Sequence, residues 1–572
     1  MPESRQAPLR ICAVVDGPRV PQWVAEVLGR VEAACELDLC QVVTLSLGPP
    51  PVSPPLGARL YEAMDRRIFR ASGDALKLVE LNTAPREAVP AHHSAGPCPK
   101  ALDVVLDLSA AGAPPSWLGA ARLGVWRLRH GRGDGSCPLL SELAEHQTEA
   151  VTELLARTPE HPEGRRLYRS VSSVDLTSLA RTRNPILWKG ADILLRCLLS
   201  QLSRDGAEPE CEAPETCREA PTRQVKAGRV ALTAAGRALT HAAQRQVTEE
   251  RWAIAYRRRG TSSGAGGFHV MVRPGGGEYA DPFLFTWRGR RFLFLEEVRC
   301  RFSPGVISCM EEGPEGTWLP PRVVLETGCH LSYPFVFEWQ GEVYLMPETS
   351  ANRTLELYRA EEFPWRWALD RVLMRGVSVV DATLLRHAGR FWLFANRAVR
   401  GARLHDELCV YHSDTPLGPW EPHAANPVIS DVRRARPAGR FLWVGDRLLR
   451  PSQDCGARYG HAICLNQVEE LTTTTYREVP VGRLGPDWMP RGLATHTLNS
   501  DDAYEVLDVK LRLPRRFVSG LLPWTLAAVA EVRSHGAQLR IPEGEDPWLS
   551  PQRDSLAPET NLVASARRGH AP

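Results

Sequence analysis

The second half of the chain repeats one pattern of apolar and polar residues. An opening motif leads into an apolar strand, a turn and a second aromatic-rich strand, as in DPFLFTWRGRRFLFLEE and VDATLLRHAGRFWLFAN. The copies recur about every 50–60 residues, which is typical of propeller blades. Five residues fall at equivalent positions, one per copy: Asp281, Tyr333, Asp381, Arg436 and His496. The pattern predicts an all-β five-bladed propeller with these five positions at the mouth of its central channel.

Two segments at the ends of this region are expected to close the ring. The apolar strand RWAIAYRR from Arg251 can pair with EVLDVKLRL, Glu505–Leu513, so that an early strand completes the last blade. Closure of this kind removes exposed sheet edges. We therefore place the propeller at residues 227–515.

The first part of the chain, residues 8–203, alternates short apolar runs with amphipathic stretches. DVVLDLS at Asp103–Ser109 is apolar almost throughout, as expected of a strand covered on both faces. The stretch NPILWKGADILLRCLLSQL carries apolar residues at three- and four-residue spacing and predicts a helix. Strands separated by helices indicate a parallel α/β layer.

The remaining segments lack a regular apolar pattern. Residues 204–226 are rich in Pro, Glu and Thr and are interpreted as a linker. Residues 516–540 hold a short apolar run and are interpreted as a closing helix, and residues 541–572 as a disordered tail.

Composition narrows the function classes. The 70 basic and 67 acidic residues nearly balance, with a net charge of +3, and no basic run interleaves with aromatics, so no nucleic-acid partner is expected. The 14 cysteines form no C-x-x-C pair, which argues against a zinc site or a disulfide scaffold. No signal peptide is recognised at the start, and the run from Val518 is too short to span a bilayer. We expect a cytoplasmic protein, with a peripheral membrane contact at that run left open.

Carboxylates beside strongly apolar strands are the main catalytic candidates, because burying a charge without a partner is costly. Asp281, Asp381 and Glu348 are assigned to catalysis. For the two aspartates, an Asx-turn at the blade entrance is the structural alternative, and for Glu348 it is a cap or turn role at the exit of blade two. Glu296 and Glu297 follow an apolar strand, and alternation lets only one face the channel; Glu297 is chosen.

A set of polar and cationic residues is expected to bind substrate opposite these carboxylates. Arginine matches phosphate or carboxylate groups bidentately, so Arg436 and Arg450 are candidates for holding an anionic ligand. The alternative is an internal network in which they neutralise the carboxylates. No metal ligand is assigned. The full set of predicted binding residues is Glu297, His330, Tyr333, Arg436, Arg450, Gln453, Asp454, Tyr459, His461 and His496.

Several strings in this region resemble the N-terminal domain family of glucosamine inositolphosphorylceramide transferase and its bacterial relatives. They are HLSYPFVFEWQGEVYLMPET, LYRAEEFPWRW, LGPWEPHAANPV, RPAGRF and RPSQDCGARYG, and they span about residues 250–515. The resemblance implies a role in glycoconjugate biosynthesis. In the plant enzyme the sugar-transferring domain lies beyond the resembling region.

The predicted propeller is also similar in fold to arabinanase- and fructosidase-type glycoside hydrolases. That resemblance implies a blade-one Asp as base or nucleophile and a blade-three Asp that tunes pKa, which Asp281 and Asp381 match by motif. The Glu acid of a later blade has no counterpart, because blade four opens with Arg436. Glu348 or Asp454 would have to serve.

The front layer looks like a degenerate formyltransferase-type, Rossmann-like domain. LGVWRLRHGRGDG, with His130, stands where that family has an Asn-x-His-Pro-Ser-Leu-Leu-Pro loop, and the Asn, the Ser and the Leu-Leu-Pro are missing. Formyl transfer needs an Asn and a His near the carbonyl.

These observations predict a carbohydrate-active transferase that modifies a carbohydrate or glycolipid, with a sugar nucleotide as one candidate donor. Three alternatives stay open: a five-bladed glycoside hydrolase, a non-catalytic glycan- or headgroup-binding propeller, and a formyltransferase acting on a sugar amine. A purely binding propeller should have every channel carboxylate paired with arginine.

Overall fold

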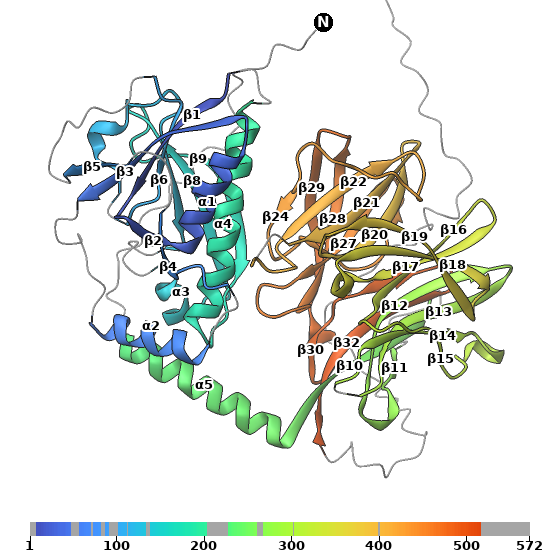
Figure 1. Ribbon diagram of the computed structural model, residues 1–572. Coiled ribbons are helices and arrows are strands. Elements are labelled where there is room, and N and C mark those ends of the chain that lie inside the picture. The colour runs from blue at the N-terminus through green and yellow to red at the C-terminus, as the bar shows by residue number, and fades with distance from the viewer. Residues whose placement is uncertain are drawn as a thin grey trace, which may run out of the picture.

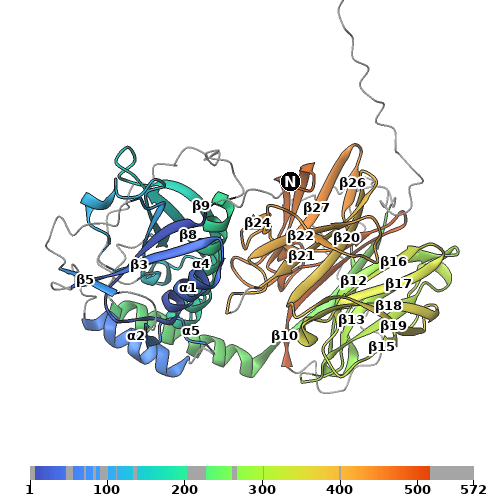
Figure 2. The same cartoon turned by 45° about the horizontal axis from the view of Figure 1, so that its top comes forward.

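The computed structural model places two domains side by side, joined by a long helix (Figures 1 and 2). It describes residues 7–46, 56–69, 73–81, 86–90, 101–110, 112–132, 138–202, 227–259, 267–300, 302–398 and 401–515. The predicted linker at 204–226, closing helix at 516–540 and tail at 541–572 lie outside these residues.

The N-terminal domain is built on one seven-stranded sheet in the order β5-β3-β1-β6-β7-β8-β9. Its strands are β1 (Leu9–Val15), β3 (Leu37–Ser46), β5 (Arg86–Pro90), β6 (Val104–Asp107), β7 (Val125–His130), β8 (Glu149–Arg157) and β9 (Arg165–Ser173). The first five in the sheet order pair in parallel, whereas β7, β8 and β9 pair antiparallel. The predicted α/β domain is present, but its sheet is mixed rather than wholly parallel.

Few helices accompany this sheet within the described ranges. They are α1 (Gln22–Ala33), α2 (Leu56–Ile68), α3 (Leu140–Ala144), α4 (Leu179–Leu202) and α5 (Ala227–Val247), and a small ribbon pairs β2 (Arg19–Pro21) with β4 (Leu78–Glu80). Apolar residues of α1 and α4 share one core with β1 and β6. The antiparallel end arises because β7 returns through α3 to a neighbouring strand instead of making a helical crossover. A Rossmann-like layer therefore stays a prediction.

The propeller consists of five small sheets. Blade one holds β12 (Glu278–Trp287), β13 (Arg290–Val298), β14 (Gly305–Glu311) and β15 (Arg322–Leu325); blade two holds β16 (Ser332–Trp339), β17 (Glu342–Glu348), β18 (Thr354–Glu362) and β19 (Arg366–Arg375). Blade three holds β20 (Val379–His387), β21 (Arg390–Arg397), β22 (Glu407–Ser413), β23 (Glu421–Pro422) and β24 (Ile429–Ser430). Blade four holds β25 (Arg436–Pro437), β26 (Leu442–Val444), β27 (Arg447–Asp454), β28 (Ala462–Leu471) and β29 (Tyr476–Leu484). The prediction of an all-β propeller is confirmed.

The fifth blade contains the predicted closure. It combines β10 (Thr248–Arg258) and β11 (His269–Met271) with β30 (Gly492–Ala494), β31 (Leu498–Ser500) and β32 (Tyr504–Pro514). β10 pairs antiparallel with β32 over its whole length, from Thr248 opposite Pro514 to Arg258 opposite Tyr504. The predicted propeller range also included residues 227–247, which form α5 and pack against α2 and α3 of the other domain instead. The first propeller strand begins at Thr248, and its buried apolar run, which pairs with β32, begins at Trp252.

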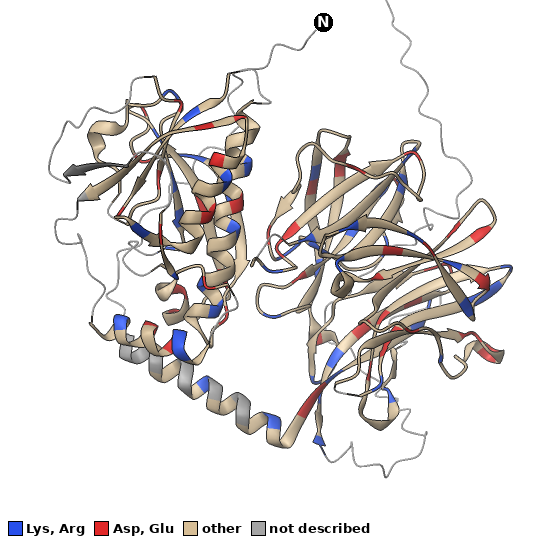
Figure 3. Ribbon diagram, in the orientation of Figure 1, with Lys and Arg blue, Asp and Glu red and all other residues tan. Residues whose placement is uncertain are grey.

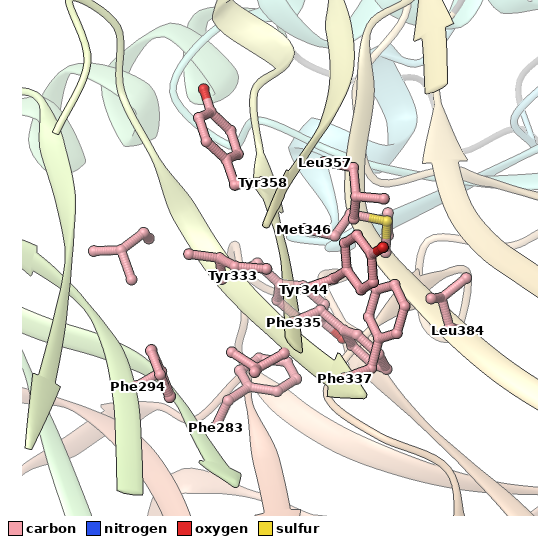
Figure 4. Close-up of a cluster of buried hydrophobic side chains, with 14 of the residues drawn as sticks. Phe283, Phe294, Tyr333, Phe335, Phe337, Tyr344, Met346, Leu357, Tyr358 and Leu384 are labelled. Carbon is pink, nitrogen blue, oxygen red and sulfur yellow. The ribbon is translucent and has the colours of Figure 1, made fainter. Parts of the chain in front are cut away.

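Aromatic side chains fill the space between blades. One continuous cluster draws on blades one, two and three, with Phe283, Phe335 and Phe337 fully buried at its centre (Figure 4). Phe283 meets Tyr333 edge-on, with ring centroids 4.8 Å apart. This rigid packing fixes the strand ends that carry the polar residues of the channel.

No helix within the described ranges is long and apolar enough to cross a membrane. A cytoplasmic location and a peripheral membrane contact stay predictions.

Candidate functional site

One residue near the start of the inner strand has an unusual backbone in each of three blades. Asp281, Tyr333 and Asp381 have φ values of 49°, 46° and 52°, and each lies at a break in the register between the first two strands of its blade. A non-glycine residue in this region costs about 1–3 kcal/mol and persists only where the surroundings impose it. The break re-aims the side chain relative to ordinary strand alternation. The predicted equivalence is confirmed for these three blades.

Blades four and five enter the channel differently. Arg436 pairs with Gln453 in a short two-residue strand, and His496 lies between β30 and β31. Both residues still reach the same cavity as Asp281. The five residues therefore share a place at the mouth of the channel, but they do not share one backbone conformation.

A cavity of about 290 Å³ lies at this mouth of the propeller. Six predicted site residues line it: Asp281, His330, Glu348, Arg436, Tyr459 and His496. The rest of its lining is Trp252, Glu278, Ala280, Glu296, Val298 and Ser332. It is more polar than a typical ligand pocket, in which a few polar groups stand among apolar ones.

Asp281 is buried, and its carboxylate accepts hydrogen bonds from a hydroxyl and a backbone N–H rather than from an arginine. One carboxylate oxygen accepts a hydrogen bond from the Thr497 hydroxyl at 2.6 Å and the other from the Tyr333 backbone N–H at 3.1 Å. His496 Nδ1 lies 3.9 Å away. Burial raises the pKa of Asp281 to about 7, against the opposing effect of His496. The group can therefore gain and lose a proton near neutral pH.

His496 is a charged neighbour of the Asp281 carboxylate. Its Nδ1 lies 2.5 Å from an Asp508 carboxylate oxygen, and its ring stacks on Trp252 with centroids 4.0 Å apart. Burial alone would lower its pKa, but Asp508 and Asp281 outweigh it and raise the pKa to about 9. His496 is thus a buried cation at neutral pH.

Arg436 is the centre of a second cluster on the same wall. Its guanidinium binds both oxygens of Asp381, at 2.6 and 3.0 Å, and lies 3.6 Å from a Glu348 oxygen. Gln453 donates to Asp381 at 2.7 Å. Asp381 therefore lies behind Arg436 and holds it, while Glu348 reaches the cavity.

Glu348 has a protonation state different from an ordinary glutamate. Burial and the neighbouring Asp381 raise its pKa to about 8, although Arg436 and the Ser350 hydroxyl, which donates at 2.6 Å, oppose the shift. The carboxyl is accordingly protonated at neutral pH and can donate a proton into the cavity.

Strand alternation settles the choice between the two glutamates at the end of β13. Glu296 lines the cavity and lies 3.2 Å from His330 Nε2. Glu297 points to the other face, where it binds Arg273 at 2.8 Å and the Ser308 hydroxyl at 2.6 Å. The predicted binding role of Glu297 is corrected in favour of Glu296, because the register of β13 decides which side faces inward. The hydrogen bond that His330 donates to Glu296 raises the pKa of His330.

Four other predicted residues lie outside the lining of the inner cavity. Arg450 is fully buried and binds Glu478 through both carboxylate oxygens at 2.7 Å. Asp454 binds Arg483 at 3.1 Å. The Tyr333 hydroxyl bridges Thr383 and the Gly439 N–H. The His461 backbone N–H donates to the Arg458 carbonyl in the β27–β28 loop. Carboxylates of the protein pair with both Arg436 and Arg450, as in the alternative of an internal network, and binding of an anionic ligand by either arginine stays a prediction.

Sequence reasoning missed Trp252 and Glu278. The signal was present for Trp252, because the predicted pairing of its strand with β32 fixes which of its side chains face the channel. Glu278 lies three residues before Asp281, and its approach to the cavity depends on the register break that follows.

Asp281, His496 and Asp508 could together hold a metal ion, since one ligand atom from each lies within 4.8 Å of the others and all three residues are buried. An imidazole and two carboxylates suit several divalent cations. The same group is also a closed hydrogen-bond network, because Asp508 accepts the backbone N–H groups of His496 and Thr497 at 2.8 and 3.0 Å.

The propeller loop between β21 and β22 contacts both the α/β domain and residues that line the cavity. Lys189 of α4 binds Asp406 at 2.8 Å, with both side chains buried. The preceding residue, His405, packs near Tyr459, and the Leu404 carbonyl accepts a hydrogen bond from Arg436. Docking of the two domains therefore bears on the position of Arg436.

His130 lies inside the α/β domain at the end of β7. Its Nδ1 is 3.1 Å from the Thr152 hydroxyl, and the ring packs against Gly190 of α4. Burial lowers its pKa to about 4, so the imidazole is neutral.

Comparison with known proteins places the similarity in the propeller. Residues 275–488 match the family described as "Glucosamine inositolphosphorylceramide transferase 1, N-terminal". Proteins named glucosamine inositolphosphorylceramide transferase 1 are 39% identical in Oryza sativa subsp. japonica and 38% identical in Arabidopsis thaliana, each over 206 residues and 35% of this chain. The chain spans 28% and 27% of the length of these two relatives. This similarity supports the resemblance to that family.

Among solved structures, a family 117 glycoside hydrolase from Zobellia galactanivorans is 11% identical, with a TM-score of 0.32, and covers 45% of this chain and 90% of its own. An exo-β-1,3-galactanase from Clostridium thermocellum is 13% identical, with a TM-score of 0.31, and covers 37% of this chain and 52% of its own.

Proposed function

We propose that this protein is a carbohydrate-active transferase that uses the propeller cavity to act on a sugar or sugar-phosphate headgroup in glycosphingolipid-type biosynthesis. The similarity over residues 275–488 supports this, and that range includes Asp281, Glu348 and Arg436. Trp252 and His496 complete the cavity from outside the matched range.

The observation that carries the proposal is the pair of titratable carboxyls on one small cavity. Asp281 has a pKa of about 7 and Glu348 a pKa of about 8. A base that titrates near neutral pH and an acid that is protonated there are the two groups that sugar transfer by acid–base catalysis needs.

The proposed reaction moves a glycosyl group to an acceptor hydroxyl. The hydroxyl oxygen forms a bond to the anomeric carbon while Asp281 takes the hydroxyl proton. The bond between that carbon and the leaving oxygen breaks, and Glu348 gives its proton to that oxygen. His496 stabilises the ionised Asp281 before the transfer, and Asp381 and Gln453 hold Arg436 beside Glu348. A sugar nucleotide is the donor class we propose.

Hydrolysis is the second candidate, and the same two carboxyls support it. Water would replace the acceptor hydroxyl, with Asp281 as base and Glu348 as acid. A purely binding propeller is less well supported. Among the described residues, the Asp281 carboxylate contacts Thr497, Tyr333 and His496, and no arginine is among these partners.

The formyltransferase alternative would require His130 to contact the substrate. Its Nδ1 meets Thr152 and its ring faces α4. The α/β domain is therefore proposed as a support for the propeller cavity.

The test is product analysis by mass spectrometry. The full chain is incubated with nucleotide sugars and myo-inositol 1-phosphate or an inositolphosphoryl lipid, and wild type is compared with Asp281→Asn and Glu348→Gln. We expect a glycosylated acceptor from wild type and a loss of about 10²–10⁴ in rate in both variants. Glu342→Gln, an exposed glutamate of the same blade, serves as the control. Free sugar alone would select hydrolysis, and full activity of Asp281→Asn would exclude both.

A further inference from the structure

A second and larger cavity adjoins the first. It has a volume of about 630 Å³ and shares Glu278, Val298 and His330 with the inner cavity. Its walls come from the end of α5, the start of β10, the loops that follow β11 and β13, the β27–β28 loop and the end of β32. We call it the outer cavity. A group bound there lies directly beside the candidate catalytic residues.

Arginine dominates the charge of the outer cavity. Its lining holds three glutamates, Glu249, Glu250 and Glu278, and five arginines, Arg245, Arg251, Arg458, Arg512 and Arg515. Figure 3 shows where these charges meet, as the basic end of α5 passes into the acidic start of β10.

The ion pairs within the outer cavity leave positive charge unmatched. Arg251 pairs with Glu249. Arg458 and Arg512 share the single carboxylate of Glu250, at 3.2 and 3.3 Å.

Two of the arginines have no carboxylate partner at all in the described part of the chain. They are Arg245 and Arg515, and both are exposed. Burial also raises the pKa of Glu278, which favours its neutral form and adds to the positive balance.

The inner cavity has no such unmatched arginine among the residues that line it. Its single arginine, Arg436, is held by Asp381 and approached by Glu348. An anionic group of the substrate would therefore find its favourable partners in the outer cavity and not beside the carboxyls. The inner volume of about 290 Å³ lies at the small end of ligand pockets and suits a compact group.

We propose that the outer cavity is a phosphate-binding subsite, with Arg245, Arg458, Arg512 and Arg515 as its donors. Guanidinium groups match phosphate oxygens bidentately and are the side chains best suited to several phosphate contacts at once. The inference rests on the proposed function, since the sugar would occupy the inner cavity while a phosphate attached to it occupies the outer one. The phosphate belongs either to a phosphodiester-linked lipid headgroup or to the diphosphate of a nucleotide sugar.

The test uses isothermal titration of the full chain with four probes: inorganic phosphate, myo-inositol 1-phosphate, uridine diphosphate and uncharged myo-inositol. The variant carries Arg245→Glu and Arg515→Glu. Both side chains are exposed and have no carboxylate partner among the described residues, so the fold should be retained. Arg447→Glu, an exposed arginine at the first position of β27, is the charge-matched control. Circular dichroism and thermal unfolding verify folding of each variant.

We expect the double variant to weaken binding of the phosphate-bearing probes at least tenfold and to leave myo-inositol binding unchanged. Wild-type affinity for these probes should fall as salt rises. Whichever of the two probes, myo-inositol 1-phosphate or uridine diphosphate, binds more tightly identifies the source of the phosphate. Equal affinity in wild type and double variant, an equal loss in Arg447→Glu, or no binding of any phosphate probe to wild type overturns the subsite.

A second variant separates this inference from the proposed function. Asp281→Asn removes the proposed base without touching the outer cavity. If it abolishes product formation but keeps phosphate binding, both proposals stand. If wild type forms no product, but binds the phosphate probes and the double variant does not, the subsite stands and the proposed reaction fails.

Discussion

At the residue scale, the partner of each carboxylate decides its role. Asp381 and Glu297 each bind an arginine and lie outside the lining of the inner cavity. Asp281 and Glu348 instead face the cavity, where burial raises the pKa of both. Chemically identical groups on equivalent strands thus become structural or reactive through the cation that the fold places beside them.

The first prediction concerns the pH dependence of activity. With Asp281 as base and Glu348 as acid, kcat/KM should follow a bell with limbs near pH 7 and pH 8. The acidic limb falls because Asp281 becomes protonated, and the alkaline limb because Glu348 loses its proton. Initial rates of product formation between pH 5 and pH 10 provide the measurement. A rate that does not change across this range would contradict the assignment.

The second prediction concerns His496 and stability. Its folded-state pKa of about 9 exceeds the ordinary value of 6.5, so its stabilising effect is complete below pH 6.5 and is lost as pH rises to about 9. The shift corresponds to about 3 kcal/mol. In urea unfolding, wild type should lose free energy of unfolding over this window, and His496→Gln should lose much less. His269→Gln, at an exposed position, is the control and should keep the wild-type slope.

At the element scale, the inner strands are tied together across blades. The Tyr333 hydroxyl in blade two contacts Thr383 in blade three at 2.8 Å and accepts from the Gly439 N–H in blade four at 2.7 Å. Gly439 has a φ of 118°, and a Cβ there would lie 2.0 Å from the Leu498 carbonyl oxygen of blade five. Four blades therefore meet around this one contact, which explains why an apolar strand carries a tyrosine at its second position.

The third prediction tests that contact. Tyr333→Phe removes the hydroxyl and leaves the buried Gly439 N–H without its acceptor, which should cost about 1–3 kcal/mol of unfolding free energy. Tyr344→Phe, in the next strand of the same blade, is the matched control and should change stability by less than about 0.5 kcal/mol. Urea unfolding followed by tryptophan fluorescence gives both values. Equal effects in the two variants would show that the hydroxyl bridge is not stabilising.

At the scale of the whole molecule, buried ion pairs join the two domains. Lys189 binds Asp406, and Arg196 binds both oxygens of Glu407 at 2.8 and 2.9 Å. Lys189 offsets the cost of burying Asp406 and lowers its pKa. The propeller loop that carries Asp406 also supplies the carbonyl that Arg436 contacts, so the domain interface and the cavity share one wall.

The fourth prediction tests this interface. Lys189→Ala leaves Asp406 buried without a cation and should destabilise the full chain by about 3–5 kcal/mol, whereas the double variant Lys189→Met, Asp406→Leu should restore most of the loss. Limited proteolysis and urea unfolding provide the measurement. Arg19→Ala, which breaks an exposed pair with Glu80, should change stability by less than about 1 kcal/mol. An unchanged Lys189→Ala protein would exclude the ion pair as a link between the domains.

Much of the propeller is encoded locally and could be predicted from the sequence. The repeat of aromatic strands predicted the blades, and the apolar pattern around Arg251 predicted closure with β32. Both signals are local in the sequence, because strand pattern and turn spacing do not depend on how the blades are arranged. The same local signals placed Asp281, Glu348, Arg436 and His496 at one mouth.

Only the tertiary structure decided which of these residues face the cavity and what charge they carry. The register of β13 makes Glu296, and not Glu297, face the cavity. Arg450 pairs with Glu478 and does not line the cavity. The antiparallel end of the first sheet and the departure of α5 from the propeller depend likewise on contacts between distant segments. The sequence thus determined the elements and the candidate groups, whereas burial and ion pairing, which set the pKa of each group, exist only in the assembled fold.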